Sequence, residues 1–349
     1  MKFENEIIEA AVREAIGKPD GAVSYKDVEA LHELTITEHL TDLRGLEQFT
    51  ELREVTLDDT EATDLTPLGQ LQNLEDLRLH TSQVTDLTPL ANLKKLKVLF
   101  LTNAPVTDLT PLSGLSMLDA LHLNETLVRD LSPLKNLTRL TSLNLGFTKV
   151  TEIASLENLK YLESLWLSRT SVKDLTPVTG FVNLESLFLG YTPVSDLTPL
   201  AGLESLFSLD LNSVSQVKDI SPLARLDNLE YLSLDSTAVE ELKPLSNLKN
   251  LKKISLSNTA VRDLEPLANL KNLRDLFLDE TTVSDLSPLA SLNELVTLDV
   301  SASKVSDLAP LKALKKLESL TVESCDMDIS IQAEIIKVLE SRGVDVVTD

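Results

Sequence analysis

A short leucine pattern returns along most of this chain, and its period constrains the fold more than any other feature of the sequence. The motif Leu-x-x-Leu-x-Leu begins at Leu74, returns 22 residues later at Leu96, and returns again at Leu118. Self-similarity at such a period indicates stacked repeats, which overrides the two domains that a length of 349 residues would suggest. The second apolar residue of each short strand marks fourteen repeats: Ile36, Leu57, Leu79, Leu101, Leu123, Leu145, Leu167, Leu189, Leu211, Leu234, Leu256, Leu278, Val300 and Val322.

One repeat is too small to bury both its strand leucines and the second apolar ridge that follows, such as Leu87, Leu90 and Leu93. Stacked repeats bury both, because each covers its neighbour and the strands pair in parallel. The sequence therefore predicts an α/β solenoid that is curved, with about 14 parallel strands on the concave face and short helical turns on the convex face. The spacing between Leu211 and Leu234 is 23 residues, with the extra residue in the segment 211–217. We interpret this residue as a tolerated insertion, with a bulge that re-aims a contact as the alternative.

Two polar positions recur in the turn after each strand. The first is mostly a hydroxyl, which we expect to turn inward and bond backbone groups of the turn; its members are Thr60, Ser82, Ala104, Thr126, Thr148, Thr170, Thr192, Thr237, Thr259, Thr281, Ser303 and Cys325. The second, the acidic column, is Asp42, Asp64, Asp86, Asp108, Asp130, Glu152, Asp174, Asp196, Asp219, Glu241, Asp263, Asp285 and Asp307. We expect each of these carboxylates to accept backbone N–H groups in its own turn. A ladder of calcium sites is the alternative.

Proline marks the start of the convex segment. Eleven of the fourteen prolines, from Pro67 to Pro310, occupy this one position, and Ser or Thr usually precedes them, as in Thr88-Pro89. This pair predicts an N-cap residue followed by the first residue of a helical turn. Ser155 replaces proline in one repeat, where we expect a looser turn.

The two ends of the chain depart from the repeat, as terminal caps do. The sequence predicts an amphipathic helix over 4–16, ended by Gly17 and Pro19, and a second short helix from Ser24 to about Leu31. A helix over 330–341 and a last strand at 344–347 are predicted at the other end. The expected organisation is one continuous structural domain with a helical N-terminal cap (1–30), a repeat solenoid (31–328) and a C-terminal cap (329–349).

Charge and composition exclude several classes of function. The formal net charge of -23 opposes binding to nucleic acids and to anionic membranes. No apolar run is long enough for a membrane helix, and one cysteine excludes an internal disulfide framework. The N-terminus carries acids where a secretory signal carries bases, which predicts a cytoplasmic protein. The alternative is a secreted protein whose targeting segment has been removed. We expect the protein to be a monomer.

The repeat unit, Leu-x-x-Leu-x-x-Leu-x-Leu-x-x-Thr-x-Val-x-Asp-Leu-x-Pro-Leu-x-x, resembles the 22-residue leucine-rich repeat of bacterial internalins and their relatives. The segments 248–269 and 270–291 show it clearly, and the resemblance covers about 31–328. Thr stands here where that family usually has Asn. The resemblance implies a leucine-rich repeat solenoid that binds proteins through its concave face, and it provides no catalytic residues.

The alternation within each strand indicates which side chains face the concave side. The residue between the two strand leucines faces inward, and the residue two positions after the second leucine lies beside it. Between 98 and 191 these two positions carry most of the aromatic residues, whereas acidic residues prevail on either side. The acidic flanks serve either solubility or the binding of a partner with a basic surface at its ends. We predict a protein-binding patch, with mutual packing of the aromatic side chains as the alternative; its residues are Phe100, His122, Phe147, Trp166, Arg169, Phe188 and Tyr191.

The sequence favours binding over catalysis. His80 and His122 lie two repeats apart, too far to share a metal, and Cys325 is expected to be a small buried filler. No phosphate-binding loop or nucleophile motif is present, so we expect no cofactor and no metal. The predicted function is a non-enzymatic module that binds an unidentified protein partner. The alternatives are a secreted internalin-like adhesin or virulence factor and, from another class, an enzyme with His122 and Glu125 in an improvised concave-face site.

Overall fold

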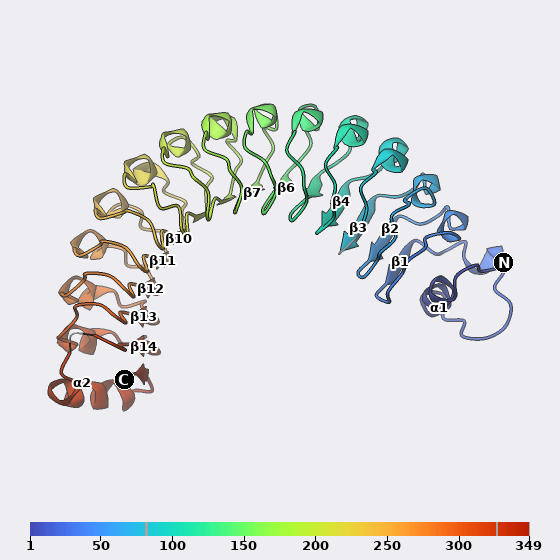
Figure 1. Cartoon of the computed structure of the whole chain (residues 1–349). Helices are drawn as coiled ribbons and strands as arrows, with labels where there is room; N and C mark the ends of the chain where they lie inside the picture. The colour runs from blue at the N-terminus through green and yellow to red at the C-terminus, as the bar shows by residue number, and fades with distance from the viewer. Residues whose placement is uncertain (81–82, 326, 349) are drawn as a thin grey trace. The chain divides into compact units, whose positions relative to one another are not determined.

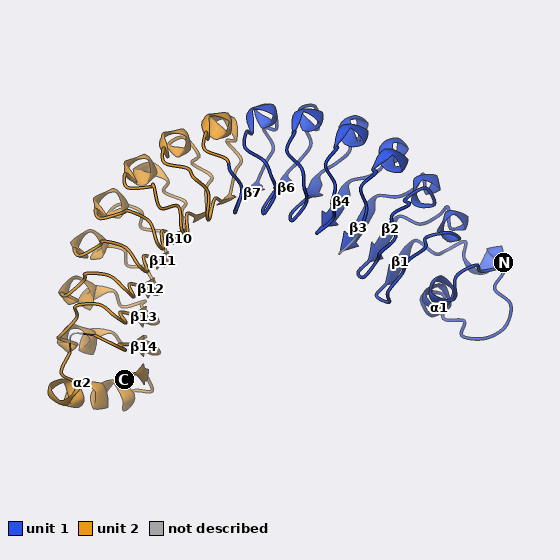
Figure 2. Cartoon of the chain, viewed as in Figure 1, with its two compact units in different colours: residues 1–171 blue, residues 172–349 orange. Residues whose placement is uncertain are grey.

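The computed structural model describes residues 1–80, 83–325 and 327–348, so Ser82 of the hydroxyl position lies outside the described residues. The chain divides into two compact units, residues 1–171 and 172–349, which we describe separately (Figure 2). In both units parallel strands lie on one face and short 3₁₀ helices on the opposite face (Figure 1). The leucine-rich repeat solenoid predicted from the sequence is therefore confirmed, including both caps.

The described residues of the first unit, 1–80 and 83–171, contain one α-helix and seven strands. Each strand residue pairs with the residue one repeat further on, so that Leu99 of one strand lies beside Leu121 of the next. The elements are α1 (Glu6–Ala15), β1 (Glu33–Ile36), β2 (Glu54–Leu57), β3 (Asp76–His80), β4 (Val98–Thr102), β5 (Ala120–His122), β6 (Ser142–Asn144) and β7 (Ser164–Trp166), with 3₁₀ helices at Tyr25–Asp27, Leu46–Gln48, Leu68–Gln70, Thr88–Asn92, Thr110–Gly114, Ser132–Leu134 and Ala154–Leu156.

The second unit continues the same pattern and ends in the C-terminal cap. The 23-residue repeat is absorbed between strands, because Leu209 pairs with Leu232 and the flanking registers are regular. The elements are β8 (Ser186–Phe188), β9 (Ser208–Asp210), β10 (Tyr231–Ser233), β11 (Lys253–Ser255), β12 (Asp275–Phe277), β13 (Thr297–Asp299), β14 (Ser319–Thr321), α2 (Ile329–Glu340) and β15 (Asp345–Val347), with 3₁₀ helices at Thr176–Gly180, Thr198–Leu200, Ser221–Arg225, Lys243–Leu245, Glu265–Leu267, Ser287–Ser291 and Ala309–Ala313.

The core of each unit is a stack of aliphatic side chains. In a typical repeat the strand residues Leu99 and Leu101 are fully buried, and so are Leu109 and Leu112 from the opposite side. The residue between the two strand leucines is only half-buried, which confirms the period-2 alternation. This alternation is what presents one side chain per repeat to the inner face.

The hydroxyl position behaves as predicted. The Oγ1 of Thr148 donates to the carbonyl of Leu145 at 2.6 Å, and Thr126, Thr170, Thr192, Thr237, Thr259 and Thr281 repeat this bond in their own turns. Each of these side chains is buried. The carbonyl of Leu145 also accepts the backbone N–H of Thr148 at 3.3 Å, so the hydroxyl adds a second and shorter bond to the same carbonyl. The buried hydroxyl is thereby satisfied within its own turn, which explains why a small hydroxyl recurs here.

The acidic column also behaves as predicted. Each aspartate of the column accepts the backbone N–H of the residue two positions later, as Asp86 does from Thr88 at 2.8 Å. The hydroxyl and backbone N–H of Thr88 lower the pKa of Asp86 below its ordinary value of 3.8. These carboxylates therefore close their own turns.

The prediction that Ser or Thr caps the convex helices is wrong. In the helix Thr88–Asn92 the N-cap residue is Leu87, and Thr88 is already the first helical residue. Asp86 accepts the backbone N–H of Thr88, so the aspartate side chain caps the start of the helix, which is the role that we predicted for the hydroxyl. The helix expected from Ser24 to about Leu31 is also shorter, since it spans only Tyr25–Asp27. The Ala154–Leu156 turn forms without proline, with Leu156 buried as in the other repeats.

We expect the acidic column to make stability depend on pH. Hydrogen bonds to the turn lower the folded-state pKa values of Asp86, Asp108 and Asp130 below 3.8, so the unfolded chain takes up protons first as the pH falls. The contribution of these three carboxylates is therefore present above pH 3.8 and is lost as the pH falls through their folded-state pKa values. Replacing Asp86, Asp108 and Asp130 by Ala should lower the melting temperature at pH 7, and the difference from the unmodified chain should shrink at pH 2.5. Circular dichroism measures both. A melting temperature that fell on addition of EDTA at pH 7 would instead support the calcium ladder.

Candidate functional site: the inner face of the strands

Three side chains of the predicted patch form a continuous aromatic row in the first unit. Phe100, His122 and Trp166 are half-buried, and each lies between the two strand leucines of its repeat, whose side chains point into the core. Phe100 is the central residue of β4, whereas His122 and Trp166 are the last residues of β5 and β7. The rings of Phe100 and His122 stack with centroids 4.0 Å apart and an interplanar angle of 3°. The ring of His122 also meets that of Trp166, at 5.7 Å and 59°. The expected mutual packing is therefore present, but it leaves all three rings partly exposed.

Contact between His122 and Trp166 spans two strand spacings, or about 10 Å of backbone. The intervening strand β6 carries Asn144, whose Oδ1 accepts the backbone N–H of Gly146 at 3.0 Å. This bond holds the amide side chain to its own turn, which allows the two rings to approach each other. At the other end of the row, the Arg78 guanidinium lies 4.8 Å from the Phe100 ring centroid.

His122 is neutral at physiological pH. Its Nε2 lies 3.1 Å from the Oγ of Ser142. Burial, with a smaller effect of the charge on Arg78, lowers the pKa of His122 from 6.5 to about 4. Because an uncharged ring can be desolvated at little cost, His122 serves the row as a flat stacking surface. The ring of His122 has Ser142 as its hydrogen-bond partner, and Glu125 is exposed in the following turn. This arrangement does not support the catalytic alternative, which requires His122 to act together with Glu125.

Phe147 and Arg169 lie beside this row, in the turns that follow β6 and β7. The Arg169 guanidinium lies 5.3 Å from the centroid of the Phe147 ring. Phe147 is 51% exposed. The sequence predicted the exposure of this position, and the structure pairs the two residues as an aromatic ring with a cation.

The backbone at this second position is left-handed, which the sequence did not predict. Phe147 and Arg169 have φ angles of 59° and 58°. The same conformation recurs once per repeat at Asn103, Glu125, Tyr191, Ser213, Ser236, Asn258, Glu280, Ala302 and Ser324. Asn and Gly adopt this conformation with least strain, so Asn103 and Asn258 were the residues that could have indicated it in the sequence. The other residues at this position are of mixed types, which hid the pattern.

The second unit carries the remaining two predicted residues at the equivalent positions of their own repeat. Phe188 is the half-buried last residue of β8, between the two strand leucines of its repeat, and it lies in register with Asp210 of β9. Tyr191 is 51% exposed and has a φ of 60°. Both side chains therefore face the inner side of their unit, as predicted.

Other candidate sites are weaker. Within residues 1–80, 83–325 and 327–348, no group of three or more His, Cys, Asp or Glu side chains is placed to hold a metal ion. Over the same residues, no helix has the length and apolar character that crossing a membrane requires. Cys325 is half-buried rather than fully buried, and its thiol donates to the carbonyl of Val300 at 3.1 Å, so it partly replaces the hydroxyl of other repeats.

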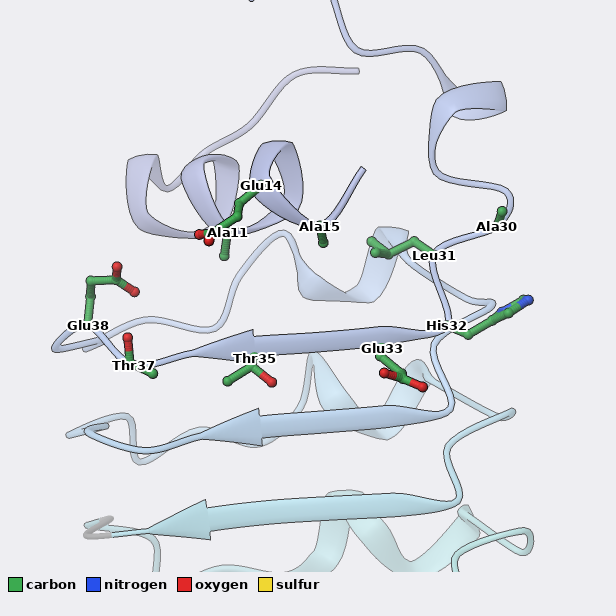
Figure 3. Close-up of a pocket in the computed structure, with 10 residues that line it drawn as sticks. All are labelled: Ala11, Glu14, Ala15, Ala30, Leu31, His32, Glu33, Thr35, Thr37 and Glu38. Atoms are coloured by element: carbon green, nitrogen blue, oxygen red, sulfur yellow. The ribbon is translucent and has the colours of Figure 1, made fainter. Parts of the chain in front are cut away.

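A cavity of about 620 Å³ lies in the N-terminal cap, between α1 and β1 (Figure 3). Its lining includes Glu14, Glu33 and Glu38. The sequence did not predict this cavity, because its walls come from a helix and a strand whose packing distance is set only in the folded chain.

Comparison with known proteins supports the sequence-based resemblance. A family model described as leucine-rich repeats (2 copies) matches residues 249–291. No curated protein matches the chain significantly. Among solved structures, an internalin (InlF) of Listeria monocytogenes is 28% identical, with a TM-score of 0.84 over 90% of this chain and 96% of that one.

More distant structures share the fold. A leucine-rich repeat protein of Leptospira interrogans is 20% identical, with a TM-score of 0.84 over 99% of this chain and 100% of that one. A plant peptide hormone receptor, RGFR1, is 19% identical with a TM-score of 0.70, and the match covers 84% of this chain but 51% of the receptor. The 22-residue repeat, the family model and these structures lead to the same conclusion: the chain is a leucine-rich repeat protein that is similar to a bacterial internalin.

Proposed function

We propose that this protein is a non-enzymatic module that binds a protein partner through the aromatic side chains on the inner face of its strands. Leucine-rich repeat proteins typically serve as protein-interaction scaffolds. The plant receptor RGFR1 was solved in complex with RGF2, an example of a ligand held by this fold. For the present chain the partner is inferred from the chemistry of the inner face.

The observation that carries the proposal is the presence of large aromatic residues where the fold disfavours them. Phe147 and Tyr191 are half-exposed and adopt a left-handed backbone, a combination that is strained for bulky residues. The same backbone position accepts Asn, Ser, Glu and Ala elsewhere in the chain, so folding does not require an aromatic residue there. Exposed, partly strained aromatic groups on an inner face are typical of binding hot spots, and Phe147 lies beside the row of Phe100, His122 and Trp166 within the first unit.

The chemistry of the row indicates the kind of partner surface. Phe100, neutral His122 and Trp166 offer flat apolar area, and Arg169 beside Phe147 offers a cation already placed over a ring. Arg78 lies over the Phe100 ring at one end of the row, and its guanidinium is paired with Asp76 at 2.8 Å. Such a surface fits an apolar or aromatic patch of a partner that carries an acidic group at its margin. The net charge of -23 argues against nucleic acid as the occupant.

Replacing Phe147 by Asn should separate binding from folding. Asn adopts the left-handed conformation with less strain, so we expect the free energy of unfolding to stay the same or to rise by about 0.5–1 kcal/mol. Partner affinity should fall about tenfold, since an exposed aromatic contact is removed. Urea unfolding and a binding titration measure the two effects.

Glu280→Asn is the matched control, because Glu280 has the same backbone conformation, with a φ of 55°, in a turn that carries none of the patch residues. It should leave affinity unchanged. Full affinity in the Phe147→Asn variant, or a clear loss of stability, would show that Phe147 is retained for folding and would contradict its place in the binding site.

A further inference from the structure

The sheet of the first unit has one edge, at β1, whose backbone groups face away from the other strands. The carbonyls of His32 and Ile36 accept N–H groups of Glu54 and Asp58, each at 3.0 Å. In a parallel strand, alternate residues direct their N–H and C=O groups toward opposite edges. The backbone N–H and C=O groups of Glu33 and Thr35 therefore point to the outer edge of β1.

Helix α1 covers this edge incompletely. Its side chains Ile8 and Val12 are buried and close the end of the core. On the side that faces β1, however, the helix presents Ala11 and Ala15, and these short side chains leave the cavity of about 620 Å³ between helix and strand (Figure 3). That volume lies within the range of ordinary ligand sites.

The cavity is acidic. Glu14 from α1, together with Glu33 and Glu38 at the two ends of the strand, lines it, and no Lys or Arg is among its lining residues. His32 lies at the margin, where its Nδ1 is 3.1 Å from the carbonyl of Glu51. Three carboxylates around exposed strand-edge groups favour an occupant that combines positive charge with an extended backbone.

We propose that the outer edge of β1 is a second binding site, which accepts an extended, lysine- or arginine-bearing segment of a partner protein as an added strand. The segment would pair its backbone with Glu33 and Thr35, and its cationic side chains would lie near Glu14, Glu33 and Glu38. A second copy of this chain is disfavoured as the occupant. Its own edge strand β15 begins with the exposed Asp345, which would add another negative charge to the cavity.

The probe is a short synthetic peptide, acetyl-Lys-Val-Lys-Thr-Lys-Thr-amide, added to the full chain. On binding, hydrogen-exchange mass spectrometry should show about tenfold slower exchange in the segment 31–36, because the Glu33 and Thr35 amides gain partners. Two control peptides test separately whether backbone pairing and positive charge are required for binding. One carries N-methyl groups on alternate backbone nitrogens, and the other carries Glu in place of each Lys; neither should slow the exchange.

Variants of the protein test the geometry. Ala15→Leu fills the cavity from an exposed position and should weaken peptide binding about tenfold, whereas Ala10→Leu, on the exposed side of the same helix, should not. Glu33→Gln with Glu38→Gln should weaken binding, and Glu241→Gln, far along the sequence, should leave it unchanged.

Binding that survives Ala15→Leu, or that leaves the exchange of 31–36 unchanged, would overturn the site. Dimerisation of the chain that Ala15→Leu abolishes would identify a second copy as the occupant and would overturn the proposed partner. None of these variants changes the aromatic row, so the outcome is independent of the inner-face function.

Discussion

Trp166→Ala should abolish partner capture while the fold remains intact. Trp166 is the largest ring in the aromatic row, and its removal from a buried interface should cost about 2 kcal/mol or more, a loss of roughly 30-fold in affinity. Its side chain is half-exposed and does not fill the leucine core, so the melting temperature should change little. Combining it with Phe188→Ala in the second unit should deepen the loss.

The experiment uses the immobilised full chain, a lysate of the producing organism and quantitative mass spectrometry. Phe277→Ala is the matched control, because Phe277 is also the half-buried last residue of a strand, β12, but contacts Lys253 instead of the row. Proteins captured by the unmodified chain and by Phe277→Ala, and lost from Trp166→Ala, are candidate partners. If Trp166→Ala captured the same proteins at full yield, the aromatic row would not be the binding site.

Phe181→Ala should cause the largest loss of stability. Phe181 is a fully buried phenylalanine at a ridge position where the next repeat has Leu203. Truncation leaves a cavity that the stacked repeats on either side hold open, so we expect a cost of about 3–5 kcal/mol. Hydrogen exchange over the second unit should accelerate most near 178–206, because a solenoid couples each repeat mainly to its neighbours.

Val182→Ala provides the comparison, since Val182 is the adjacent residue but is 59% exposed. Its effect should stay within about 0.5 kcal/mol. Equal effects of the two substitutions on urea unfolding would mean that the Phe181 side chain is not held in a dense core.

Much of the site could be predicted from the sequence, and the features that could not be predicted have physical causes. Alternation along short strands placed Phe100, His122 and Trp166 on the inner face, because side chains in a strand follow a strict period of two. The contact between His122 and Trp166 could not be predicted. It depends on ring orientation and on the bond that holds Asn144 to Gly146, both of which are decided by neighbouring repeats.

A second feature that the sequence did not predict is a series of asparagine side-chain hydrogen bonds that join adjacent repeats. The amide of Asn250 donates to the carbonyl of Asp227 at 2.8 Å, and Asn73, Asn228 and Asn272 make the same kind of bond to the preceding repeat. We did not single out this column in the sequence. The partner of each amide is a carbonyl about 23 residues earlier, so the bond exists only after stacking sets the two turns side by side.

The sequence by itself determined the repeat architecture, the position of the strands and caps, and the roles of the hydroxyl and aspartate positions within their own turns. These follow from local rules: the period of the leucines, and polar side chains that bond within their own turn. Only the tertiary structure decided the left-handed backbone under Phe147, the neutral state of His122 and the cavity beside β1. Each of these depends on groups distant in sequence, and burial and packing distance are properties of the folded chain alone.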